Sequence, residues 1–278
     1  MTTMTAKLNG DYALGLARAA GGAILFGLPL LMTMEMWAIG LHIAPPRLLL
    51  FLLLNFVVLV FLSRFGGFER TATFTEDLLD ALAAQAVGIV ISLLILALFG
   101  LLRPQMAFAE LVGQVAIQGV PASFGAMIAR KQLGEGEADT DEVLARRSAG
   151  YGGQLFLMLA GALFLAFNVA PTEEMVLIGY KMTAWQALIL MLVSLGLLHA
   201  LVFAVGLSGQ EQAPQGYGAL RLFLIFTVPG YAIALLTSFY VLWTFGSIDG
   251  LGFGTLARIV VVLGFPAAIG AAIARLVI

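Results

Sequence analysis

Apolar residues along this chain gather into eight long stretches, which are separated by short polar or turn-forming segments. Each stretch is close to the roughly 20 residues that an α-helix needs to cross a bilayer. A helix satisfies its backbone hydrogen bonds within one segment, so helices are favoured over strands in lipid. The pattern predicts an all-α, polytopic transmembrane helical bundle. The expected helices cover approximately residues 17–43, 47–64, 80–100, 109–129, 152–178, 184–207, 219–246 and 254–278.

The second half of the chain repeats motifs of the first half in the same order. GVPASFGAMIAR, from Gly119, matches GFPAAIGAAIAR, from Gly264, with Pro121 aligned to Pro266. Two weaker pairs are TMEMWAIG with TEEMVLIG and VGIVISLL with PGYAIALL. Matches at one nearly constant offset indicate an internal duplication.

Eight helices in two copies give four helices per copy. An even number returns the second copy to the same side of the membrane, which predicts parallel repeats related by a pseudo-two-fold axis along the membrane normal. The expected organisation is a first repeat at 1–130, a polar cytoplasmic linker at 131–149 that contains EGEADTDE, and a second repeat at 150–278.

Composition and charge agree with a membrane location. The chain is 61% hydrophobic and 11% charged, against about 25% charged residues in an average soluble domain. If the N-terminus is cytoplasmic, only four of the 14 Lys and Arg residues face outward, namely Arg47, Arg103, Lys181 and Arg258. This bias predicts a multi-pass membrane protein with both termini cytoplasmic.

Several functional classes are disfavoured. The net charge of −2 without a basic cluster argues against nucleic acid as a partner. The absence of cysteine excludes disulfides and thiolate metal sites. HExxH, a Walker loop and a dinucleotide fingerprint are all missing, and two distant histidines do not form a convincing metal set. We therefore expect no enzyme, no cofactor and no metal.

Three segments resemble a known family. LARAAGGAILFGLPLLMTMEMW, FNVAPTEEMVLIGY and VVLGFPAAIGAAIARL are similar to a family of bacterial integral membrane proteins with no assigned function, and the resemblance covers nearly the whole chain. It implies a place in the bacterial inner membrane, about seven spans and a small partner protein encoded beside it. Four spans per copy explain the repeat offsets and the charge bias better, so we expect eight.

Two acids at equivalent repeat positions are the main candidates for function. Glu35 lies within the first expected helix, where a charge costs about 2.5–3.5 kcal/mol at the helix centre. Its counterpart Glu174 follows Pro171, which is expected to interrupt the fifth helix. Thr172 would then be the N-cap of a short helix, with Glu173 in its first turn. No similar break is expected near Glu35.

Other polar residues are expected at a similar depth. Arg258 is a candidate to neutralise one acid, and Asn168, Thr33 and Gln114 are candidates to hydrogen-bond the others. A static buried ion pair between the two copies would explain this set. Alternatively, the acids form a polar centre at the repeat interface that binds a cation or carries a proton.

Four prolines are expected to kink helices or to allow close packing: Pro121, Pro266, Pro171 and Pro229. Glycines beside Pro121 and Pro266 favour packing as their role. Arg275 ends the last helix and is interpreted as a snorkelling anchor.

These observations together predict a channel or transporter for a small cation or a proton-coupled solute. The alternative is a non-transporting membrane anchor or sensor subunit for the small partner protein. The chain is expected to contact the lipid bilayer, and a homo-oligomer is a further possibility.

Overall fold

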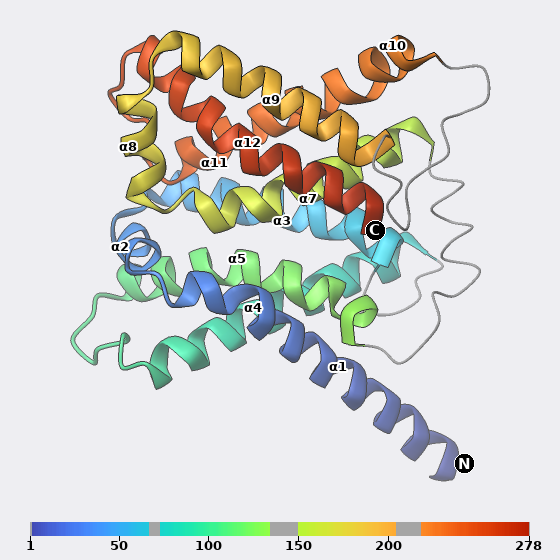
Figure 1. Ribbon diagram of the computed structural model, residues 1–278. Helices are drawn as coiled ribbons and strands as arrows, with labels where there is room; N and C mark the ends of the chain where they lie inside the picture. The colour runs from blue at the N-terminus through green and yellow to red at the C-terminus, as the bar shows by residue number, and fades with distance from the viewer. Residues whose placement is uncertain (1, 67–72, 134–149, 204–217, 278) are drawn as a thin grey trace. The chain divides into compact units, whose positions relative to one another are not determined.

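The structure is a computed structural model that describes residues 2–66, 73–133, 150–203 and 218–277 (Figure 1). Helices account for nearly all of these residues, and none of them forms a strand. The all-α prediction is therefore confirmed. By its internal contacts the chain divides into two compact units, Met1–Arg146 and Arg147–Ile278. The predicted linker lies mostly outside the described residues, so its boundaries stay a prediction.

The two units have the same order of elements. Unit 1 comprises α1 (Thr2–Leu31), α2 (Met34–His42), α3 (Pro45–Gly66), α4 (Phe74–Leu98) and α5 (Phe108–Leu133). Unit 2 comprises α7 (Tyr151–Val169), α8 (Glu173–Lys181), α9 (Ala184–Phe203), α10 (Ala219–Leu222), the π-helical segment η1 (Phe223–Thr227), α11 (Val228–Thr244) and α12 (Phe253–Val277).

Eight stretches of the described helices are long and apolar enough to cross a membrane, which agrees with the predicted number. The first and fifth expected helices were nevertheless too long. The stretch 17–43 divides into α1 and α2, and the stretch 152–178 divides into α7 and α8. Of these four helices, only α1 and α7 are long enough to cross a membrane. The nine residues of α2 or α8 extend just about 14 Å.

The last helix of each unit lies at the centre of that unit. In unit 1, α5 packs against α1, α2, α3 and α4, and its spanning part is 83% buried. In unit 2, α12 packs against α7, α8, α9 and α11 in the same way, and its spanning part is 61% buried. Both central helices continue through the prolines inside them, Pro121 and Pro266.

Close backbone contacts between glycines fix the central helix of each unit. A Cβ atom added to Gly125 of α5 would collide with the carbonyl oxygen of Gly22 in α1. In unit 2, a Cβ atom on Gly270 of α12 would collide in the same way with the carbonyl oxygen of Gly161 in α7. Helices in lipid gain most of their association energy from such close packing. The glycines of the repeated motif therefore serve packing, as the sequence predicted.

We predict that Gly270→Ala destabilises the protein by about 1–3 kcal/mol, because the added methyl group meets backbone that cannot move aside cheaply. Gly196→Ala is the matched control, since nothing lies within 4 Å of a Cβ atom at Gly196 of α9. Thermal unfolding in detergent should show a lower midpoint for Gly270→Ala and no loss for Gly196→Ala. Equal midpoints would contradict the close crossing of α7 and α12.

Candidate functional site

Glu35 lies in the first turn of α2, so the expectation of an unbroken helix around it was wrong. The span of α1 ends at Leu31, before Glu35. Figure 1 shows α2 nearly end-on at the end of α1, so its axis runs across the spans of unit 1. An acid at a helix start is stabilised by the helix dipole, and the helix-centre cost does not apply outside the span. Glu35 therefore has the same local explanation as Glu173.

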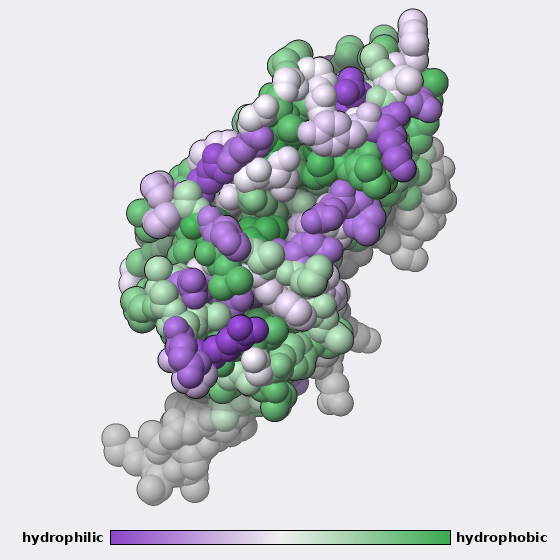
Figure 2. All heavy atoms as spheres, turned by 90° about the vertical axis from the view of Figure 1, so that its left-hand side faces the viewer, coloured by the Kyte–Doolittle hydropathy of each residue, from purple (hydrophilic) through white to green (hydrophobic). Residues whose placement is uncertain are grey.

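The acids of unit 2 lie at the start of α8, after the interruption predicted at Pro171. In Figure 1, α8 runs across the end of α7. Glu173 and Glu174 are exposed. Together with Thr172, Ser247 and neighbouring apolar residues they line an open pocket of about 560 Å³. Figure 2 shows hydrophilic side chains scattered among apolar ones on the face seen from the left of Figure 1.

The two threonines before these short helices make other hydrogen bonds than those predicted. Thr33 and Thr172 occupy N-cap positions, but neither side chain makes a capping hydrogen bond. Instead, the Thr33 hydroxyl donates to Leu30 O (2.8 Å) and the Thr172 hydroxyl donates to Val169 O (2.9 Å). Each threonine thus satisfies a carbonyl at the end of the preceding span.

The other predicted partners hydrogen-bond neutral oxygens. Arg258 Nε donates to Gly179 O (3.0 Å) and its Nη2 donates to Thr255 Oγ1 (3.1 Å), so these bonds fasten α8 to α12. Gln114 Nε2 donates to Trp37 O (3.4 Å) and fastens α2 to α5. Asn168 Nδ2 donates within its own helix, to Phe164 O. The bonds of Arg258 and Gln114 hold short helices in place, and none of these bonds assembles an acid centre.

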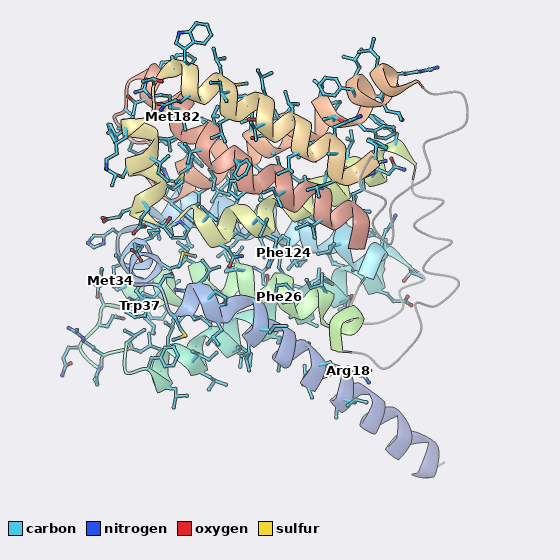
Figure 3. All side chains as sticks on the ribbon, viewed as in Figure 1. Arg18, Phe26, Met34, Trp37, Phe124 and Met182 are labelled. Carbon is cyan, nitrogen blue, oxygen red and sulfur yellow. The ribbon has the colours of Figure 1, made fainter. Side chains whose placement is uncertain are left out.

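Trp37 closes the outer end of unit 1, where outer means the predicted non-cytoplasmic side. Trp37 is labelled in Figure 3. Its indole Nε1 donates to Leu31 O (2.7 Å). The ring packs on an apolar cluster of Leu31, Leu96 and Val115, which come from α1, α4 and α5. We call these three residues with Trp37 the outer cluster.

Pro229 accompanies a change of helix type. A proline cannot donate to the carbonyl four residues earlier, which here is Ile225 O. The Tyr151 hydroxyl donates to Ile225 O instead (2.8 Å), and Val228 N donates to Phe223 O in the π-helical pattern. The kink expected at Pro229 thus corresponds to a π-helical segment that a tyrosine from α7 supports.

Arg275 does not snorkel, which corrects the interpretation of this residue. It is 7% exposed, and its guanidinium lies 5.1 Å from the ring centre of Phe203 and 4.4 Å from that of Phe226. Its Nη2 also donates to Gln154 Oε1 (3.0 Å). Desolvated cation–π contacts of this kind stabilise by about 2 kcal/mol or more. Arg275 therefore ties α7, α9, η1 and α12 together.

A network of uncharged polar side chains lies in the middle of unit 1. Asn55 Nδ2 donates to Gln85 Oε1 (3.0 Å) and to Ser123 Oγ (3.0 Å), which links α3, α4 and α5. Each residue is near the middle of its helix, and Asn55 is 4% exposed. This central network was not identified from the sequence, because single amides in apolar stretches carry no motif.

Two buried carboxylates lie nearer the inner, predicted cytoplasmic, end of unit 1. Asp77 is 3% exposed and accepts from Arg64 Nε (2.7 Å) and Ser63 Oγ (2.8 Å). Asp80, 6% exposed, follows on the same face of α4. The expected span began at residue 80, which left Asp77 outside it and placed Asp80 at its very first residue, so neither was a candidate. The signal was present in FTEDLLDAL, where acids three residues apart continue the buried face of Ala84 and Gly88.

This arrangement defines a multi-pass α-helical integral membrane protein with short helices across the ends of its spans. The chain belongs to the family described as "Putative integral membrane protein (DUF2391)", whose model matches residues 15–278. No curated protein and no solved structure matches the chain. Among the described residues, no group of three His, Asp or Glu side chains could hold a metal ion.

We predict that Asn55→Leu lowers the free energy of unfolding by about 1–3 kcal/mol, because it removes two hydrogen bonds and leaves Gln85 Oε1 without its donor. Asn168→Leu is the control, since the Asn168 amide bonds only its own helix. Thermal unfolding of the two variants should show the larger loss for Asn55→Leu. A loss no larger than that of Asn168→Leu would mean that the central network does not hold α3, α4 and α5 together.

Proposed function

We propose that this protein is a bacterial inner-membrane channel or transporter for a small cation or a proton-coupled solute, and that unit 1 contains its pathway. The observation that carries this proposal is Asp80, a carboxylate that is 6% exposed inside a spanning helix. Ionisable residues at such positions are costly and mark ion or proton pathways by default. In this proposal Asp80 replaces Glu35 and Glu174 as the intramembrane acid.

Asp77 and Asp80 have different roles in this proposal. The Arg64 guanidinium and the Ser63 hydroxyl hold the Asp77 carboxylate in place, which favours a structural role. Asp80 lies about one turn further along α4, on the face that continues through Gly88 towards α5. A cation or proton at Asp80 would therefore be near the level at which the central network begins.

The uncharged central network supports passage of a polar species. Amide and hydroxyl groups can replace the hydration shell of a solute in the middle of the bilayer, where lipid supplies no hydrogen bonds. Glu35 of unit 1 lies at the opposite end from Asp77, where it would attract cations to the entrance. Glu173 and Glu174 would do the same at the pocket of unit 2.

Flux measurements in proteoliposomes test this proposal. We expect proton or rubidium flux in the wild type and a decrease of about tenfold or more in Asp80→Asn, because removal of the charge raises the barrier by at least about 1.4 kcal/mol. Asp80→Glu should restore part of the flux. The control is Glu76→Gln, which keeps the capping bond of α4 on an exposed side chain.

Two other outcomes would contradict transport through Asp80. A folded Asp80→Asn protein with wild-type flux would remove this acid from the pathway. Wild-type protein without flux of protons, rubidium or small solutes would favour the alternative, an anchor or sensor subunit for a small partner protein. That partner, and a homo-oligomer, stay predictions, as does the absence of enzyme activity.

We also predict that the linker and both termini are cytoplasmic, from the distribution of Lys and Arg. Because the chain has no cysteine, a single cysteine at Glu137, in the linker, or at Lys181, at the end of α8, can be labelled with an impermeant maleimide. The two positions should be labelled from opposite sides of the membrane. Labelling from the same side would contradict this orientation.

A further inference from the structure

Two polar side chains of unit 1 are fully buried without hydrogen-bond partners. Gln118 of α5 and Ser92 of α4 are each 0% exposed. Neither the amide nitrogen and oxygen of Gln118 nor the hydroxyl of Ser92 has a partner among the described residues. Each unsatisfied group costs about 1–3 kcal/mol in a protein interior. Such a cost indicates that something other than the protein satisfies these atoms.

The two residues share one layer of the helix bundle. Ser92 lies four residues before Leu96, and Gln118 lies three residues after Val115. Leu96 and Val115 both belong to the outer cluster. Residues three or four apart lie on the same helix face, one turn away. Ser92 and Gln118 therefore lie directly inward of the outer cluster, where α1, α4 and α5 pack together.

Unit 2 shows that its own helices pack without polar groups at these positions. By the alignment of Pro121 with Pro266, Gln118 corresponds to Leu263, and by the alignment of Gly88 with Gly230, Ser92 corresponds to Ala234. Leu263 and Ala234 are both 0% exposed. Both corresponding positions of unit 2 thus hold apolar side chains, so the polar pair in unit 1 is not required for helix packing as such.

We propose that Gln118 and Ser92 form a binding site for a small, neutral solute that both donates and accepts hydrogen bonds. The Gln118 amide offers two N–H donors and one acceptor oxygen, and the Ser92 hydroxyl offers both functions. A bare cation would be repelled by the amide N–H groups and needs several oxygen ligands. A neutral molecule of the size of water or urea satisfies all of these groups.

This inference deepens the proposed function and rests on it in one respect. If Asp80 carries a proton, the neutral molecule at Gln118 and Ser92 is the solute that moves with it. The outer cluster then separates this binding site from the outer side of the membrane. A hydrophobic constriction next to a polar site is a common arrangement for closing a pathway.

Accessibility of a cysteine tests the site without any assumption about transport. Ser92→Cys changes one atom in a cysteine-free chain, and Ala234→Cys is its matched control in unit 2. We expect methyl methanethiosulfonate, a small neutral reagent, to modify Ser92→Cys at least about tenfold faster than Ala234→Cys in folded protein. A tenfold ratio corresponds to a difference of about 1.4 kcal/mol in the free energy needed for the reagent to reach the thiol. Equal rates would overturn the site. Thermal unfolding verifies that both variants fold.

Gln118→Leu tests the solute class, because it copies the residue of unit 2. We expect this variant to fold with an equal or higher melting temperature, since it removes an unsatisfied buried amide. Urea entry into proteoliposomes, followed by light scattering, should decrease about tenfold relative to wild type, which corresponds to about 1.4 kcal/mol. Wild-type protein that conducts protons or rubidium but lets urea enter no faster than protein-free liposomes do would overturn the assignment of a neutral solute.

The two proposals can fail separately. If Asp80→Asn loses proton flux while Gln118→Leu keeps wild-type urea entry, the transport function stands and the solute site is wrong. If Ser92→Cys reacts rapidly but the wild type transports neither protons, rubidium nor urea, the binding site stands and the transport function is wrong.

Discussion

The close crossing of two backbones at paired glycines is the contact on which each unit depends. Lipid chains are as apolar as leucine side chains, so the hydrophobic effect does not drive helices together inside a bilayer. Contact between backbones must supply that attraction, and only glycine allows it at Gly125, which lies against the carbonyl oxygen of Gly22, and at Gly161 and Gly270, which lie against each other. Because the remaining spans pack around α5 or α12, this crossing determines where every other side chain of the unit lies.

The short helices follow from the same crossing. α5 begins further outward than the level at which α1 ends. Gly40 of α2 lies against Gly113 of α5 so closely that neither tolerates a side chain. In unit 2, Gly179 of α8 lies against Ile259 of α12, and Arg258 binds its carbonyl oxygen. The chain therefore turns across the end of the central helix, which places Glu35 and Glu174 at helix starts and outside the spans.

Sequence reasoning predicted the features that depend on composition and local pattern. Eight apolar stretches, the glycine contacts and the break at Pro171 were all accessible to it. The break at Thr33 was not predicted, because hydropathy stays high there and the nearest proline, Pro29, lies inside α1 and not directly before the break. The turn depends on contact with α5. The central network was also missed, since Asn55, Gln85 and Ser123 are far apart in sequence and meet only through helix packing.

The polar interior of unit 1 has a thermodynamic meaning that follows from its contrast with unit 2. In unit 2, hydrogen bonds and cation–π contacts join helices through Tyr151 and Arg275. In unit 1, Gln118 and Ser92 retain unused hydrogen-bonding capacity at full burial. Selection for stability alone would favour apolar residues there, as Leu263 and Ala234 illustrate. A retained cost of this kind is therefore best explained by a ligand that the polar groups recognise.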